Sequence, residues 1–158
     1  VKCPAEFIAS TLKLTTDIGP KDDRLSGLHG LSTVMGQTLL DPPTVEGWHT
    51  GKEWIDGGSL TERINYAVGL ISDMNNSGSK NLVDMIINSE LELSSEQLVS
   101  KILECSGELN VSEQTFKQLL DIASIGPVIG NNKDNDEIRK KIIRLYTLLV
   151  SSPEFQLA

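Results

Sequence analysis

The sequence predicts an all-α protein, an irregular bundle of about seven helices with one long ordered loop between the second and third helices. Three observations lead to this class. Apolar residues recur at the three- and four-residue spacing of helices in seven segments, and no segment alternates convincingly as a strand would. Capping residues or proline stand before most of these segments. At 158 residues the chain can bury a core, which with only 4% aromatic residues must consist mainly of Leu, Ile and Val.

The seven predicted helices cover, in chain order, about residues 4–17, 24–40, 59–75, 81–89, 94–105, 112–123 and 136–151. Pro4 suits the first turn of the first helix, where a proline removes no hydrogen bond. Residues 59–62 read Ser-Leu-Thr-Glu, the spacing of a capping box, and so predict the start of the third helix. Ser94 and Ser112 are the expected caps of the fifth and sixth helices. Pro153 is expected to end the last helix.

A polar break separates the third and fourth predicted helices, because residues 75–79 read Asn-Asn-Ser-Gly-Ser. We therefore expect residues 1–75 to form a helical core that contains the loop 41–58. Residues 76–158 should form a helical C-terminal part that packs on this core, so that the two make one compact unit. The chain opens on Val-Lys-Cys-Pro with no methionine, so we expect a fragment of a longer protein.

The loop at residues 41–58 is the place where a functional site is expected. It holds both tryptophans of the chain and a Pro-Pro pair, and loops of this length without regular structure are often functional. Trp48, His49, Glu53, Trp54 and Asp56 are the candidate ligand-binding residues. Apolar ring faces stack on sugars and carboxylates accept hydrogen bonds from sugar hydroxyls, so these residues suit a carbohydrate-binding or carbohydrate-processing site.

The alternative for the same loop is a structural one. Two large, rigid indole side chains would anchor the loop across the bundle, against the helices on either side of it. In that case Trp48→Ala should cost about 3–5 kcal/mol of stability. Buried indoles would favour the anchor, and an open ring face beside Glu53 or Asp56 would favour the ligand site.

Charge and composition argue against several classes of function. The chain carries 14 Lys and Arg against 22 Asp and Glu, a net charge of −8, which disfavours nucleic-acid binding. The densest basic group, residues 139–144, belongs to an amphipathic helix and fits a solvated face. No run of about 18 apolar residues exists, so the chain is not expected to span a membrane.

No recognisable catalytic motif is present, and neither a metal site nor a cofactor is expected. The pattern Gly-x-Ser-x-Gly is missing, and the cysteines, Cys3 and Cys105, lack the Cys-x-x-Cys spacing of zinc or redox sites. Two free buried thiols or one disulfide would both be compatible with their positions. Whether the chain is an enzyme stays open.

Three segments together resemble a known family. Residues 1–7, VKCPAEF, are similar to V/I-K-S/T-P-x-E-F/L, with cysteine in place of the usual serine or threonine. Residues 35–48, MGQTLLDPPTVEGW, resemble M-G-Q-x-L-F-x-P-P-x-V-x-G-W, and residues 148–156, LLVSSPEFQ, resemble L-L-x-S-P-E-F-Q. In this order they are similar to the C-terminal part of the bacterial family of unknown function numbered eighteen-hundred. The resemblance lapses over about residues 76–133.

The resemblance implies a mainly helical protein, often with an export signal, and hence a periplasmic or extracellular location. The family has no established activity, so no catalytic residue carries over. We expect a structural or interaction module whose partner is the rest of the parent chain or another protein, with a glycan ligand as the alternative. The matched positions form a structural signature, namely Pro42, Pro43, Gly47, Trp48, Arg63 and Asn65.

Overall fold

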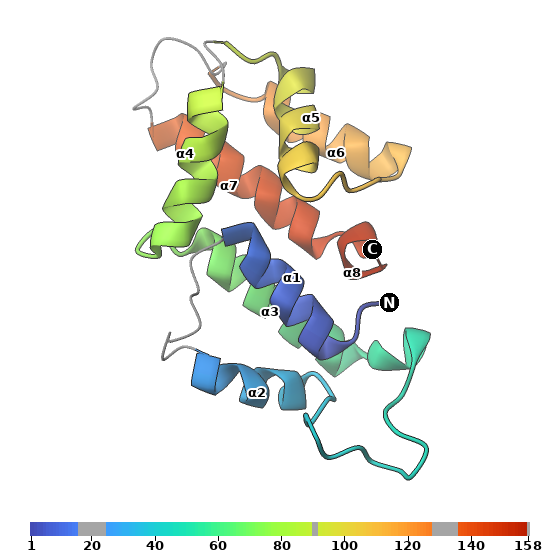
Figure 1. Ribbon diagram of the computed structural model, residues 1–158. Helices are drawn as coiled ribbons and strands as arrows, with labels where there is room; N and C mark the ends of the chain where they lie inside the picture. The colour runs from blue at the N-terminus through green and yellow to red at the C-terminus, as the bar shows by residue number, and fades with distance from the viewer. Residues whose placement is uncertain (16–24, 90–91, 128–135, 158) are drawn as a thin grey trace.

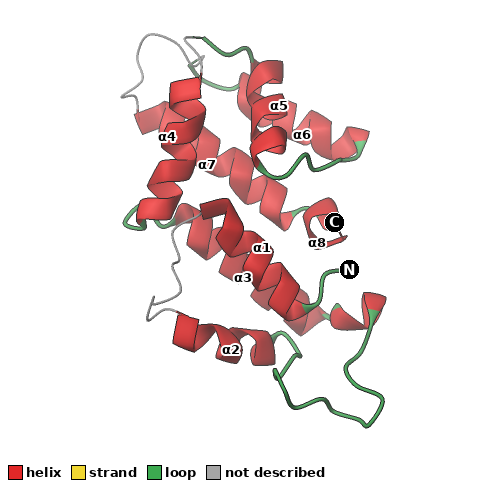
Figure 2. Cartoon of the chain, viewed as in Figure 1, coloured by secondary structure: helices red, strands yellow, loops and turns green. Residues whose placement is uncertain are grey.

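The computed structural model describes residues 1–15, 25–89, 92–127 and 136–157, and within them the chain is all helical apart from loops and turns (Figures 1 and 2). This confirms the predicted class. The elements, in chain order, are α1 (Pro4–Thr15), α2 (Leu25–Val34), the 3-10 helix η1 (Gly51–Trp54), α3 (Gly57–Ser72), α4 (Ser77–Ser89), α5 (Ser95–Cys105), α6 (Glu113–Ser124), α7 (Asp136–Ser151) and α8 (Pro153–Leu157).

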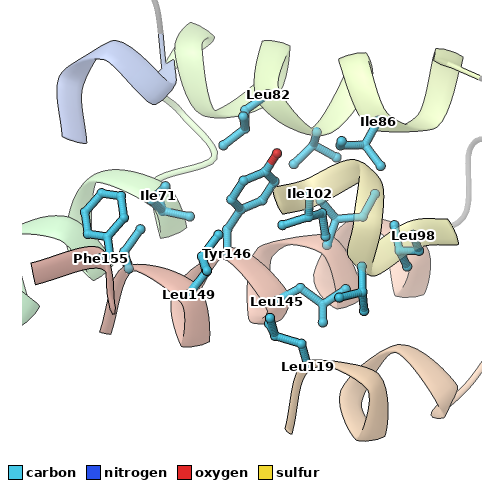
Figure 3. Packing of buried hydrophobic residues seen from close by; sticks show 14 of the residues in the cluster. Ile71, Leu82, Ile86, Leu98, Ile102, Leu119, Leu145, Tyr146, Leu149 and Phe155 are labelled. Carbon is cyan, nitrogen blue, oxygen red and sulfur yellow. The ribbon is translucent and has the colours of Figure 1, made fainter. Parts of the chain in front are cut away.

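The core is organised around α7, which packs against α3, α4, α5 and α6. Its buried side chains recur at helical spacing, and several have no exposed surface at all. Tyr146 lies between α4 and α5, with Leu82 and Ile102 beside it (Figure 3). One apolar cluster includes both Phe7 of α1 and Leu149 of α7, so side chains from both predicted parts of the chain share a core.

Two predicted caps are confirmed by their hydrogen bonds. The Ser94 hydroxyl accepts from Gln97 N at 3.2 Å, and Gln97 Oε1 accepts in return from Ser94 N, so α5 begins with a capping box. Ser112 likewise accepts from Thr115 N at the start of α6. These signals were readable because each cap lies within three residues of its partner.

The second helix ends at Val34, six residues before the predicted end at Leu40. Gly36 adopts a φ of +96°, and the amides of Gly36 and Gln37 donate to Thr33 O and Ser32 O at 2.9 and 2.7 Å. This is a Schellman motif with glycine in the left-handed position. Apolar residues continue at helical spacing beyond Gly36, but the backbone is no longer helical there.

The third helix begins earlier than predicted. Asp56 is its cap and accepts from Gly58 N and Ser59 N at 2.7 and 2.9 Å, while the Ser59 hydroxyl accepts from Asp56 N. The capping box therefore pairs Asp56 with Ser59 and does not pair Ser59 with Glu62. The fourth helix also begins earlier, at Ser77, so the polar break is a short turn after α3.

Pro153 ends α7 as expected, and it also begins a short helix, α8, that the sequence did not predict. In α8 the proline occupies the first turn, and Phe155 N donates to the Ser152 hydroxyl at 3.3 Å. This turn brings Phe155 and Gln156 back into the core, where both are buried. The N-terminus lies close to α8 (Figure 1).

Candidate functional site

Residues 38–46, which we call the arm, leave the body of the molecule as an extended loop (Figure 2). At its base Gln37 is buried, and its Oε1 accepts from Ala5 N at 2.9 Å, which fixes the base to the start of α1. Beyond that point the side chains face solvent. Leu40 is 96% exposed and Val45 is fully exposed. The arm therefore does not pack across the bundle, contrary to the structural alternative given above for the loop at residues 41–58.

Trp54 anchors the second half of the loop. It ends η1 with only 6% of its surface exposed, and its carbonyl accepts from the Ser59 hydroxyl at 3.0 Å. The indole contributes apolar burial, while the carbonyl joins η1 to the first turn of α3. The arrangement supports the structural interpretation for Trp54, and the large stability loss expected for Trp48→Ala belongs more naturally to this residue.

Asp56, a candidate ligand residue, is engaged elsewhere. Its exposed carboxylate accepts the two amide hydrogen bonds at the start of α3, and these bonds lower the pKa of Asp56. Free backbone N–H groups at a helix start attract a negative charge, so this position favours an ionised carboxylate. Asp56 thus has a structural role that accounts for its place in the sequence.

His49 and Glu53 are in contact at the surface, and Trp48 is the residue before His49 in the chain. Trp48 is half-buried, and its Nε1 is shielded from solvent without a hydrogen-bond partner in the protein. His49 stands edge-on to Trp54, with ring centroids 6.4 Å apart, and its Nδ1 lies 3.5 Å from Glu53 Oε2. Both His49 and Glu53 are exposed. Two of the five candidate ligand residues, His49 and Glu53, are therefore together at the surface.

The signature residues divide between surface and core. Pro42, Pro43 and Asn65 are exposed. Gly47 adopts a φ of +106° in a turn, and its own amide donates to Thr44 O at 3.1 Å. Glycine is favoured at that angle because it has no Cβ. Arg63, in contrast, is completely buried.

Arg63 joins the two ends of the described chain. Its Nη2 donates to Lys2 O at 2.9 Å, its Nη1 donates to Gln156 Oε1 at 3.4 Å, and its Cζ lies 5.2 Å from the Phe7 ring centroid. Lys2 continues the connection, since its Nζ donates to Phe155 O at 2.9 Å and its backbone N donates to Gln156 O at 3.0 Å. We call Lys2, Arg63, Phe155 and Gln156 the Arg63 cluster.

Sequence reasoning missed the roles of Lys2 and Gln156, although a signal was present. Lys2 belongs to the first motif of the family resemblance and Gln156 to the last, and Arg63 is one of the signature positions. The first and last segments that carry the resemblance therefore meet in space at Arg63. Burial lowers the pKa of both Lys2 and Arg63, because a low-dielectric surrounding disfavours their charged forms.

The cysteines are free thiols, and both are half-buried. In the part of the chain that the structure describes, no three His, Cys, Asp or Glu side chains come together in a way that could hold a metal ion. Within the same residues, no helix is long and apolar enough to cross a membrane.

These features define a helical module whose distinctive sequence motifs serve a buried cluster and a projecting arm. Residues 1–157 match the family model described as a protein of unknown function, DUF1800, and the chain belongs to that family. The match includes the central stretch, 76–133, where we expected the resemblance to lapse. No curated protein and no solved structure matches the chain.

Proposed function

We propose that this chain is a structural or interaction module and that the arm is the part that docks onto a protein surface. The observation that carries the proposal is the exposure of Leu40 and Val45 on a projection that two prolines stiffen. Fully exposed, these side chains add no burial to the chain itself. Each would gain about 1.5–3 kcal/mol by full burial in a partner.

The chemistry of the arm indicates the kind of surface it fits. Its charged residues are Asp41 and Glu46, both exposed, and it has no lysine or arginine. A complementary surface would offer an apolar groove with basic or hydrogen-bond-donating side chains at its edge. Such a surface belongs either to the rest of the parent chain or to another protein. Since prolines restrict the free arm, less conformational entropy is lost on docking.

The test places a photo-reactive benzoylphenylalanine at Val45 in the full-length parent protein. Irradiation should cross-link this position efficiently, within the chain if the parent supplies the surface and between chains if another protein does. The matched control is the same substitution at Met85, a half-exposed apolar residue of α4. Equal yields at the two positions would refute the proposal.

A second variant separates docking from folding. Leu40→Ser with Val45→Ser should change the free energy of unfolding by less than about 0.5 kcal/mol, because neither side chain is buried. Because Val45 is now serine, the photo-reactive residue is placed at Thr44 instead. With the probe there, the double variant should give no cross-linked product. Loss of stability comparable to a core variant would show that the arm packs within the chain.

The alternative function, a carbohydrate site, rests on a surface patch made of the exposed pair His49 and Glu53, with half-buried Trp48 next to His49 in the chain. An indole face can stack on a sugar ring, and a carboxylate can accept hydrogen bonds from sugar hydroxyls. Trp54 and Asp56 no longer support it, because one is buried and the other caps α3. A glycan array probed with the full-length protein and with Trp48→Ala tests the idea. Binding that Trp48→Ala leaves unchanged would remove this patch from consideration.

We also propose, from the family resemblance, that the module is the C-terminal region of an exported bacterial protein with a periplasmic or extracellular location. The test is to fractionate a bacterium that expresses the full-length gene with a C-terminal tag. Recovery of the tagged protein outside the cytoplasm is expected. Retention in the cytoplasmic fraction, beside a cytoplasmic marker, would contradict the proposal.

A further inference from the structure

A pocket of about 340 Å³ lies between α1, the turn after α5, and α8, and the functions proposed above do not use it. Two lysines, Lys2 and Lys13, belong to its lining, and Leu14, Leu109 and Phe155 give it apolar surface. Among the described residues, no aspartate or glutamate belongs to its lining. The pocket is thus a local concentration of positive charge in a protein with a net charge of −8.

Lys2 is the central polar group of this pocket. It is only 9% exposed, and its Nζ lies 4.2 Å from the Phe155 ring centroid. An ammonium group has three N–H donors, and Phe155 O accepts from one of them. Exposed Glu6 attracts Lys2 electrostatically, but no carboxylate of the described residues lies within ion-pairing distance of its Nζ.

A second buried cation increases the imbalance. Arg63 approaches close enough to repel Lys2 electrostatically, and it contacts a carbonyl, an amide oxygen and an aromatic ring. Taking an ion out of water costs several kcal/mol unless an opposite charge compensates for it. An anion that entered the pocket would compensate Lys2 directly and would weaken the repulsion between the two cations.

We infer that this pocket binds a small organic carboxylate, whose charged group is held by Lys2 and Lys13 and whose apolar body lies against Leu14 and Leu109. The volume suits a ligand of this class, because small-molecule sites begin at about 300 Å³. The two lysines select a ligand with a negative charge, and the apolar wall selects a ligand with a hydrophobic part. The inference does not depend on the arm.

Cys105 provides a reporter inside the pocket. It is a half-buried free thiol of the lining, whereas Cys3, also a half-buried free thiol, lies outside the lining. The full chain is treated with iodoacetamide, and mass spectrometry follows the alkylation of each cysteine. The probes are acetate, hexanoate and phenylacetate, with phenylacetamide as a neutral analogue and inorganic phosphate as an anion without an apolar part.

We expect hexanoate or phenylacetate to slow the alkylation of Cys105 at least fivefold in a saturable way, with the rate at Cys3 unchanged. Phenylacetamide and phosphate should protect Cys105 far less. The inference is overturned if none of the three carboxylates protects Cys105. It is also overturned if phenylacetamide protects as well as phenylacetate, because the lysines would then have no role.

Two substitutions test whether the charge of Lys13, in particular, is needed for carboxylate binding. Lys13→Gln changes an exposed residue, so the fold should persist, and half-protection should need about ten times more carboxylate. Lys140→Gln removes an exposed lysine of α7 and is the control for net charge, with an expected change below about twofold. Equal effects of the two variants would show that general electrostatics, and not this pocket, governs the protection. The cross-linking of the arm is unaffected by either result.

Discussion

Replacing Arg63 tests how far the buried cluster stabilises the module. Arg63→Ala removes a completely buried side chain with two hydrogen bonds and a contact with the Phe7 ring. The loss of packing costs about 2–5 kcal/mol, by analogy with other large-to-small core changes. Lys2 O is left buried without its donor, at a cost of about 1–3 kcal/mol.

One effect opposes these losses, because the variant no longer buries the charge of a guanidinium. Desolvation of such an ion costs several kcal/mol, and no carboxylate of the described residues offsets it here. The net effect of Arg63→Ala is therefore a destabilisation of about 3 kcal/mol. A comparison with Arg63→Met gives a firmer number, since both variants lose the same charge and the same hydrogen bonds.

Arg63→Met keeps most of the packing, so it should be more stable than Arg63→Ala by about 2–5 kcal/mol. Arg63→Lys keeps the positive charge but loses the planar set of N–H donors of the guanidinium group. It should be less stable than Arg63→Met, because it buries an ammonium group with fewer partners. This ranking of alanine, lysine and methionine separates the contributions of shape and charge.

Urea unfolding followed by circular dichroism measures these differences, provided that the slope with urea stays the same among the variants. The control is Arg144→Ala on the exposed side of α7, which should change stability by less than about 0.5 kcal/mol. A value for Arg63→Ala within 1 kcal/mol of the wild type would refute the claim that Arg63 stabilises the junction. A lysine variant more stable than the methionine variant would refute the claim that the buried charge is costly.

Three further predictions follow from the helix ends and the loop. Hydrogen bonds from Ser112 and Thr115 lower the pKa of Glu154 to about 2, from a reference of 4.5. The carboxylate therefore contributes stability above pH 4.5 and loses it as the pH falls towards 2. Glu154→Gln should reduce this pH dependence by about 1–2 kcal/mol in acid unfolding, after allowance for solvent screening, while Glu62→Gln should not. Trp54→Ala should cost about 3–5 kcal/mol in urea unfolding and half-buried Trp48→Ala clearly less, and equal values would contradict the assignment of Trp54 as the anchor. Gly36→Ala should lower stability by about 1–2 kcal/mol in thermal unfolding, because alanine is strained at a φ of +96°, and an unchanged melting temperature would contradict the Schellman motif.

The fold could be predicted largely because helices are local structures. Ser94 and Ser112 cap their helices through partners three residues away, so the signal lies within one turn. Errors arose where two local signals competed. Asp56 and Ser59 are both good caps, and the sequence does not say which residue leaves the helical conformation first.

The candidate site was less predictable, because it depends on contacts between distant residues. Nothing near Lys2 in the sequence indicates that it meets Arg63 and Gln156, and a buried charge is improbable for any single lysine. Lys141 is a similar case. It belongs to the basic group at residues 139–144 that we assigned to a solvated face, yet its Nζ is buried and donates to Ala123 O and Pro127 O.

The hydrogen bond between Lys2 and Phe155 also has a kinetic consequence, since it joins residues 153 positions apart. Closing a chain loop of that length costs about 4–5 kcal/mol of entropy beyond a constant term. Such a bond forms late, after nearer helices have shortened the effective loop, and a ribosome must release α8 before it can form at all. During synthesis the two buried cations would stay hydrated until that moment. We therefore expect the Arg63 cluster to be the last part of the module to assemble, and its amides to be among the first in the core to exchange with solvent.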